Sequence, residues 1–310
     1  MRAIGDAPER YDLTRDLVPF LRHKSNHVIA AAANVAGRLQ AGSVIPELQS
    51  AFLDLMKDAP ARDPACKALI AIAKALIEMD VRAAEVYFAG LKHVQKEGSF
   101  GPPVDVAAPL RGLCARGLAR TGHPEALYEI VNLLVDPEIP ARAGAAQALA
   151  EAGGSEGELL LRLKLLAGDK EEVMSECLNA LLSLAPRNSL DFVAKFLKSD
   201  SSELREAAAL ALGESRLSGA LPLLQEAYAL HRQPAFRRSL LLAIALLRQD
   251  EGVDFLLSRL EKEPEALAAA ALEALNLYAA DQQVCEKVRA IVDARNSPAL
   301  KGRVAPEPGS

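Results

Sequence analysis

Cysteine and histidine, the residues that most often carry chemistry, are few and widely spaced in this chain. Gaps of 48, 63 and 108 residues separate the four cysteines and fit no metal motif: Cys66, Cys114, Cys177 and Cys285. His23 and His27 are four residues apart, but a predicted turn separates them, and no HExxH motif occurs. A glycine-rich phosphate loop and a serine nucleophile elbow are also absent from the sequence. We therefore predict no catalytic, cofactor-binding or metal-binding residue.

One short segment, residues 91–100, gathers side chains that could contact a partner. It combines an imidazole, a cation and an aromatic ring, at His93, Lys96 and Phe100. The glycine- and proline-containing stretch that follows reads as an insertion, and loops of this kind often carry function. We interpret the segment and the loop 95–109 as a partner-binding patch. The alternative is a helix end whose loop folds back to cover the helices beneath it.

Composition indicates which elements must position these side chains. Half of the 310 residues are hydrophobic, only 4% are aromatic and none is tryptophan, with alanine and leucine supplying most of the apolar content. Both are strong helix formers, and alanine lets helix backbones approach closely. We therefore expect closely packed helices rather than sheets.

Charge and hydropathy exclude several functions. The net charge is −5, divided into +3 for residues 1–123 and −8 for residues 124–310, which disfavours nucleic acid as a partner. No apolar run reaches the roughly 18 residues that a bilayer-spanning helix needs. The N-terminal residues lack the apolar core of a secretory signal. With few cysteines as well, we expect a cytoplasmic protein without membrane contact.

An internal repeat is the strongest signal in the sequence. Segments of eight residues, such as 142–149 and 205–212, recur with a closing apolar residue every 31 or 32 positions: Leu118, Leu149, Leu181, Leu212, Ile244 and Leu275. A second series keeps the same period: Leu134, Leu166, Leu197, Tyr228 and Leu260. Two series locked to one period indicate two helices per repeat. Cys114 and Cys177 share one position of the repeat, which favours a core role over a reactive thiol, and Cys285 is expected to be the most accessible cysteine.

Proline near helix starts and glycine near helix ends place the boundaries. Asp169 and Asp200 resemble helix caps, and Gly122, Gly153 and Gly213 are expected near helix ends. The expected pairs are 12–22/26–40, 44–57/64–79, 82–95/104–121, 123–135/138–152, 156–167/170–185, 188–198/201–215, 219–230/234–248 and 250–261/264–279. A capping helix, 281–294, would close the stack.

These pairs predict an all-α, right-handed α-α superhelix of about eight helix pairs, because one pair cannot bury its apolar faces alone. We expect a single solenoid over residues 12–295. Residues 1–11 would be an N-terminal extension, and residues 296–310 a disordered tail.

From about residue 12 to residue 294 the pattern resembles the HEAT-repeat group of the armadillo-type superhelix, and is closest to short bacterial HEAT-like repeats. The family pattern has an aspartate in the turn of each repeat and an arginine six residues later. Two pairs match it: Asp105 with Arg111, and Asp136 with Arg142. Arg205 and Arg237 keep only the cation, and Met174 and Ala268 replace it. The ladder of bonds between repeats that the resemblance implies is therefore incomplete.

Several HEAT-like proteins are enzymes or enzyme subunits. Deoxyhypusine hydroxylase binds iron through repeated His-Glu pairs, which this chain lacks because no histidine adjoins a glutamate. DNA glycosylases of this architecture use aromatic platforms and cationic surfaces, whereas this chain is acidic and has no tryptophan. Bilin lyase subunits need a pigment cleft, and no residue here marks one.

We therefore predict a non-enzymatic protein-protein interaction scaffold with a protein partner that the sequence does not identify. The resemblance implies that second helices line the concave face, where the candidate partner-binding residues are Arg111, Arg142, Arg205, Arg237 and Arg238. Structural pairing of Arg111 and Arg142 with turn aspartates is the competing interpretation. The alternative function is an enzyme or enzyme subunit of the bilin lyase or DNA glycosylase kind.

Overall fold

The computed structural model describes residues 12–98 and 101–304. The described residues form helices joined by short turns, apart from one two-stranded hairpin, which confirms the predicted all-α solenoid of helix pairs. The chain divides into two compact units, Met1–Ala180 and Leu181–Ser310. The single solenoid over 12–295 stays a prediction, and the predicted extension 1–11 lies outside the described residues.

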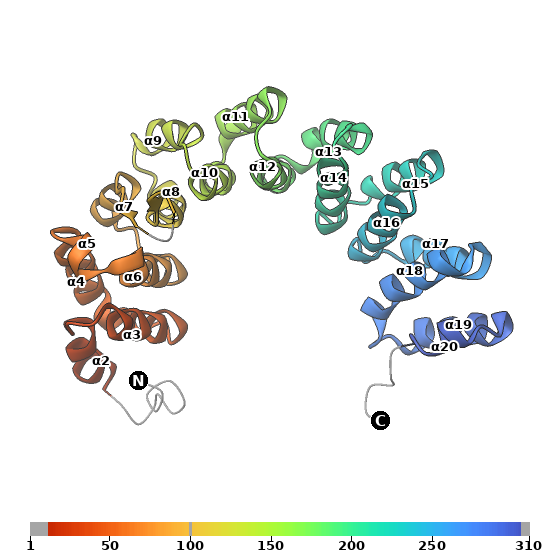
Figure 1. Ribbon diagram of the computed structural model, residues 1–310, viewed down its shortest axis with the longest axis horizontal. Coiled ribbons are helices and arrows are strands. Elements are labelled where there is room, and N and C mark those ends of the chain that lie inside the picture. The colour runs from red at the N-terminus through yellow and green to blue at the C-terminus, as the bar shows by residue number, and fades with distance from the viewer. Residues whose placement is uncertain (1–11, 99–100, 305–310) are drawn as a thin grey trace. The chain divides into compact units, whose positions relative to one another are not determined.

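In the first unit, each repeat contributes one helix to each of two layers (Figure 1). The first helices are α2 (Leu13–Leu21), α4 (Ile45–Met56), α7 (Ala84–Leu91), α9 (Ala126–Leu133) and α11 (Gly154–Ala167). The second helices are α3 (Asn26–Arg38), α6 (Lys67–Glu78), α8 (Ala108–Thr121) and α10 (Ile139–Ala152). The second helices pack on one another in chain order, α3 on α6, α6 on α8 and α8 on α10. Short helical turns fill the connections, at η2 (Gly42–Val44), α5 (Ala59–Arg62) and η3 (Pro64–Cys66).

The second unit repeats this arrangement. Its first helices are α13 (Pro186–Ala194), continued by η4 (Lys195–Lys198), then α15 (Ala220–Leu230), α17 (Asp250–Lys262) and α19 (Gln282–Arg295). Its second helices are α14 (Ser202–Glu214), α16 (Pro234–Leu246) and α18 (Glu265–Leu275), the last continued by η5 (Asn276–Tyr278). Helix α14 packs on α16, and α16 on α18. Helix α12 (Glu171–Leu184) contains the boundary between the two units.

The repeat period locates the core in nearly every helix. The six closing apolar residues of the second helices are all at most 2% exposed. In the second series, four of the five residues are buried, but Leu166 is 73% exposed and Leu165 takes the core position at 3%. Helix α11 carries leucine on all sides, so the period alone could not decide which leucine faces inward. The sequence assignment of Leu166 was therefore wrong by one residue.

Small residues let the second helices approach closely. A Cβ added to Gly144 of α10 would lie within 2.8 Å of the backbone carbon of Gly112 in α8, so the backbones themselves are in contact. Gly213 lies near the end of α14, as predicted, but without a positive φ; it is buried, and an added Cβ would meet the backbone of Ala243 at 2.8 Å. Gly122 and Gly153 do end helices with positive φ, as predicted.

Three local expectations differ from the structure. The helices expected to end at residue 95 and to begin at residue 104 end at Leu91 and begin at Ala108, and the insertion between them forms an antiparallel hairpin of β1 (Lys96–Glu97) and β2 (Val104–Asp105). Ser201 rather than Asp200 caps α14, because its side chain accepts from the Leu204 N–H. Within the tail expected to be disordered, Pro298–Lys301 form α20, which buries Leu300, whereas residues 305–310 lie outside the described part.

Candidate functional site

Four of the five predicted arginines, those other than Arg238, bond to groups of their own repeat and of the next one, and we call each such series of bonds a ladder. Arg111 in α8 is the most buried of the four. Its side chain is 3% exposed and donates to both carboxylate oxygens of Asp136 at 2.9 Å, to Asp105 at 2.7 Å and to the His93 carbonyl at 2.9 Å. Burial by itself would raise the pKa of Asp105. The bond from Arg111 and the backbone N–H groups of Gln95 and Ala107 outweigh burial, and they lower that pKa.

Arg142 forms the next rung of the first-unit ladder. It donates to both carboxylate oxygens of Asp169 at 2.8 Å and to the main-chain carbonyl of Asp136 at 2.7 Å. The Lys164 ammonium lies 2.6 Å from the same Asp169 carboxylate. Burial opposes ionisation of Asp169, but the bonds from Arg142 and Lys164 prevail and lower its pKa to about 2. The predicted cap residue Asp169 is thus a ladder acceptor.

The second unit has a weaker ladder of the same design. Arg205 donates to the Ser199 carbonyl at 2.7 Å and to the amide oxygen of Gln233 at 3.2 Å. Arg237 donates to the His231 carbonyl at 2.8 Å and lies 3.7 Å from the Glu263 carboxylate. Their guanidinium groups also stack on aromatic rings, Arg205 on Phe236 and Arg237 on Tyr228.

A common rule connects the four arginines. Each bonds to the residue six positions earlier and also reaches an acceptor 25 to 28 positions later, in the next repeat. The family resemblance implied a ladder of bonds between repeats, and its sequence pattern matched Asp105 with Arg111 and Asp136 with Arg142. For Arg142 the side-chain pairing with Asp136 was wrong, because the Asp136 carboxylate is taken by Arg111. Ion pairing therefore runs between repeats more than within them.

The remaining predicted partner-binding residues do not join the ladders in the same way. Arg238 is exposed on α16, four residues before the 39% exposed Leu242. Lys96 is exposed on β1, and His93 bonds to the side chain of Gln95 at 2.9 Å. Phe100 lies outside the described residues. Among the predicted residues with described positions, Arg238 and Lys96 are the ones whose cationic groups remain at the surface.

The 95–105 hairpin covers a buried polar junction. Gln95, which is 2% exposed, donates to the Asp63 carbonyl at 3.1 Å and to the Glu97 carboxylate at 2.6 Å. The same carboxylate accepts from the backbone N–H of Ala65 at 2.7 Å. Ala65 and its neighbour Cys66 both have positive φ, a conformation that side chains disfavour, so these bonds hold a strained turn in place. The contacts favour the interpretation of this segment as a cover.

The three buried cysteine thiols are unsuited to nucleophilic chemistry. Cys66, Cys114 and Cys177 are each 0% exposed, which agrees with the core role predicted for the shared repeat position, whereas Cys285 is partly exposed. Burial raises the pKa of Cys66 to about 12, assisted by the Asp63 and Glu97 charges, and raises that of Cys177 to about 12 as well. A thiol with such a pKa is not ionised at neutral pH, and the thiolate is the nucleophilic form.

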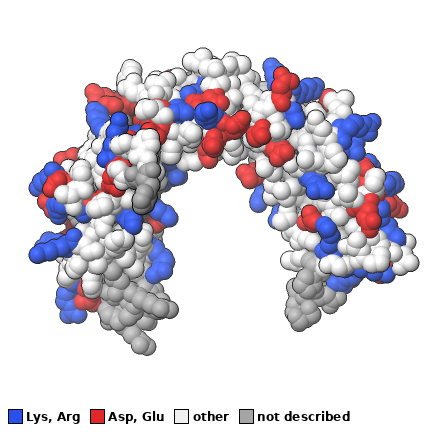
Figure 2. Space-filling view, viewed as in Figure 1, with Lys and Arg blue, Asp and Glu red and all other residues white. Residues whose placement is uncertain are grey.

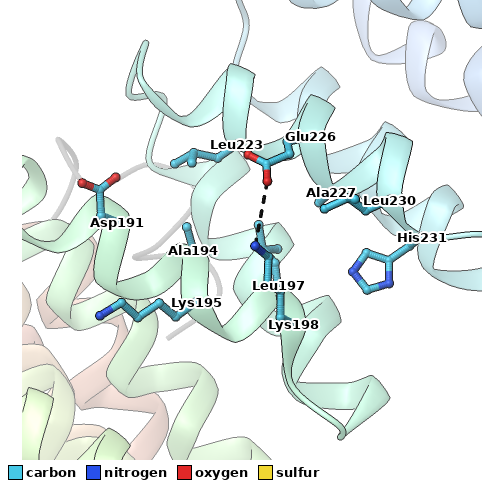
Figure 3. A pocket seen from close by; sticks show the side chains of 10 residues that line it. All are labelled: Asp191, Ala194, Lys195, Leu197, Lys198, Leu223, Glu226, Ala227, Leu230 and His231. Atoms are coloured by element: carbon cyan, nitrogen blue, oxygen red, sulfur yellow. Dashed lines mark ion pairs between the residues drawn. The ribbon is translucent and has the colours of Figure 1, made fainter.

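A groove that the sequence did not reveal lies between the first helices of the second unit (Figure 3). It has a volume of about 260 Å³ between α13–η4 and α15. Ala194, Leu197, Ala227 and the 58% exposed Leu230 supply its apolar lining. Charged side chains surround the lining: Asp191, Lys195, Lys198 and Glu226, of which Lys198 and Glu226 lie 3.8 Å apart. No local sequence motif marks this groove, because only the structure shows that Leu230 is exposed.

The family model for HEAT repeats matches residues 159–245. These residues therefore belong to HEAT repeats. The matched segment includes the groove and both arginines of the second-unit ladder. Sequence comparison with curated proteins gives no match.

Several solved structures match this chain at low similarity. The complex of CpcE and CpcF of phycocyanin lyase from Nostoc sp. PCC7120 gives 16% identity and a TM-score of 0.37, covering 91% of this chain and 94% of that chain. An engineered protein gives 19% identity and a TM-score of 0.37, with coverage of 92% and 82%. Human deoxyhypusine hydroxylase in complex with glycerol gives 17% identity and a TM-score of 0.27, with coverage of 84% and 83%.

Residues 12–98 and 101–304 contain no group of three or more His, Cys, Asp or Glu side chains that could hold a metal ion. Over the same ranges, no helix combines the length and the apolar character that crossing a membrane requires.

Proposed function

We propose that this HEAT-repeat protein is a non-enzymatic scaffold and that the groove between α13–η4 and α15 holds a side chain of a protein partner. The observation that carries the proposal is the combination of an apolar lining with charged residues around it. Interfaces are typically built in this way, with an apolar anchor buried at the centre and polar contacts at the rim. A partner segment with one large apolar side chain, flanked by polar or charged residues, fits this groove.

The hydrogen bonding of the ladder arginines supports a scaffold that contacts its partner through other residues. Arg111 and Arg142 have their hydrogen bonds directed to acidic residues and carbonyls of the solenoid. Displacing them toward a ligand would leave buried carboxylates unpaired, which is costly. We therefore retain Arg238 and Lys96 as candidate partner contacts, and assign structural roles to Arg111, Arg142, Arg205 and Arg237.

A capture experiment with matched variants tests the proposal. Wild-type chain serves as bait beside Leu230→Arg, which puts a charge in the groove, and Leu242→Arg, which alters an exposed leucine of the second-helix layer in the same unit. Because both leucines are exposed, neither change should unfold the chain, and circular dichroism checks this. A stoichiometric protein retained by wild type and Leu242→Arg but lost with Leu230→Arg supports the groove.

Two results would contradict it. If the partner is lost with Leu242→Arg or Arg238→Glu but retained with Leu230→Arg, the contact lies in the second-helix layer and not in the groove. Recovery of no protein partner, together with a pigment, a metal or nucleic acid bound to the purified chain, would favour the enzyme alternative. We also infer a cytoplasmic location, supported by four free thiols, three of them buried.

A further inference from the structure

A second groove, in the first unit, follows one face of α4, and we call it the α4 groove. It has a volume of about 470 Å³, and α2, the turn after α2, α3 and α5 complete its walls. Besides Pro46, α4 contributes residues that are spaced as on one face of a helix: Glu47, Ser50, Ala51, Asp54 and Leu55. Leu21 and Ile29, which are 1% and 3% exposed, also line the α4 groove, so it extends down to the hydrophobic core.

The end of the α4 groove at the start of α4 is negatively charged. Glu47 lies in the first turn of the helix, and its Oε2 atom is buried without a hydrogen-bond partner among the described residues. By contrast, the carboxylates of Asp12 and Asp281 accept from backbone N–H groups at the starts of α2 and α19. A carboxylate oxygen that is shielded from water and accepts no bond is unfavourable, and a donor that enters the groove can remove this cost.

The opposite end of the α4 groove is positively charged. Asp54 comes seven residues after Glu47, which is about 10 Å along a helix. Two cations share the Asp54 carboxylate, Arg62 at 2.8 Å and Lys57 at 3.3 Å. These bonds lower the pKa of Asp54, so the carboxylate is ionised at neutral pH and the cluster of three side chains carries one net positive charge.

The turn after α2 adds donors to the lining. Arg22 and His23 are both exposed there. His23 Nδ1 accepts from the Ser25 N–H at 3.0 Å, so the proton of the neutral imidazole is on Nε2, which can donate. Figure 2 shows both blue and red atoms along the left edge of the view, over the first helices of this unit. The α4 groove thus combines an unsatisfied carboxylate with an excess of cationic donors.

We propose that the α4 groove binds a short segment of a partner protein in which a basic and an acidic residue are three positions apart. In the extended polyproline II conformation such residues lie on the same side of the chain and about 9 Å apart, close to the distance of about 10 Å that separates Glu47 from Asp54 along α4. The basic side chain donates to Glu47, and the acidic one accepts from Arg62 and Arg22. The α4 groove shares no residue with the groove beside Leu230, so this binding is independent of the function proposed for that groove.

Peptide pools presented to the immobilised full chain test the charge pattern. Each pool consists of end-capped peptides with two charged residues three positions apart and uncharged residues elsewhere. The charged residues are one Lys and one Glu in the first pool, two Lys in the second and two Glu in the third. Mass spectrometry of the retained peptides should show enrichment of the first pool over the other two. Equal retention of all three pools, or retention of none, overturns the proposal.

Variants of the chain then test the position of the site, with fluorescence anisotropy of the best retained peptide as the measurement. Glu47→Gln and Arg62→Gln should each weaken binding at least about tenfold, because each removes one charge-assisted hydrogen bond. Glu85→Gln, an exposed glutamate in the first turn of α7, is the matched control for Glu47 and should leave binding unchanged. If Glu47→Gln binds as tightly as Glu85→Gln, or if Leu230→Arg abolishes binding, the peptide does not lie in the α4 groove and the proposal is overturned.

A reversal of charge shows whether Glu47 contacts the peptide directly. Glu47→Lys should lose the peptide with one Lys and one Glu and should retain the pool with two Glu, because the lining is then cationic at both ends. An indirect effect of the substitution on folding would weaken the binding of every pool alike, and circular dichroism would reveal it. A correctly folded Glu47→Lys chain that keeps the wild-type preference overturns the direct contact.

Discussion

The Arg111 rung allows a quantitative test of the ladder. Arg111→Gln removes four hydrogen bonds and leaves the Asp105 and Asp136 carboxylates, which are 4% and 12% exposed, without a cation. Breaking a buried ion pair from one side costs about 3–5 kcal/mol. Asp105 keeps two backbone N–H donors and Asp136 keeps one, from Glu138, so we expect the lower end of this range, about 3 kcal/mol.

Arg205→Gln is the matched control, because Arg205 occupies the same position of the repeat in the second unit. Its acceptors are neutral, the Ser199 carbonyl and the Gln233 amide, so its removal leaves no carboxylate without a cation. We expect a cost of about 1 kcal/mol there. Urea unfolding followed by far-UV circular dichroism measures the stability of both variants. Hydrogen exchange of amides in α8 and α10 then shows whether the loss lies in the first unit. If Arg111→Gln costs no more than Arg205→Gln, the ladder does not stabilise the protein as described.

Three further predictions concern packing, acid stability and thiol reactivity. Gly144→Ala should destabilise by about 1–3 kcal/mol in urea unfolding despite the better helix propensity of alanine, because its Cβ would meet the Gly112 backbone; equal or greater stability would contradict the close contact. The lowered pKa of Asp169, about 2, contributes about 2 kcal/mol of stability that is present above pH ~4 and lost as the pH falls toward 2. Acid titration of Arg142→Gln should show a smaller loss over that range, and an unchanged profile would contradict the assignment. Under native conditions a thiol reagent should modify Cys285 faster than the three buried thiols, whose labelling should require unfolding; equal rates at all four would refute the burial pattern.

The repeat period predicted most of the fold because each helix pair has the same packing problem. A core position such as Leu181 must recur every 31 or 32 residues wherever second helices stack, and that leucine is 0% exposed. The period carried less information where the sequence is apolar on every side. In α11 it selected Leu166 in place of Leu165, and the same excess of leucine leaves Leu159 and Leu163 exposed as well.

The candidate sites were less predictable because they depend on contacts between repeats. The residue types of the ladder were visible, but the choice of Asp169 as the acceptor of Arg142 depends on how far one repeat lies from the next. The 95–105 hairpin was missed because its strands are two residues long, too short for an alternating pattern. The groove beside Leu230 arises from two first helices that are about 30 residues apart in sequence, so no local motif marks it.

The forward reach of the ladder arginines gives the repeats a direction. Each of the four ladder arginines has an acceptor that is encoded 25 to 28 residues downstream, as for Arg111 with Asp136. Deleting the repeat that carries the acceptor therefore leaves the arginine before it without its partner. Deleting the repeat that carries the arginine leaves the acceptor in the next repeat without a donor. A gene duplication that copies a whole repeat period preserves every such pair, but one that adds a fraction of a period does not. The ladder thus favours growth or loss of this solenoid in units of whole repeats.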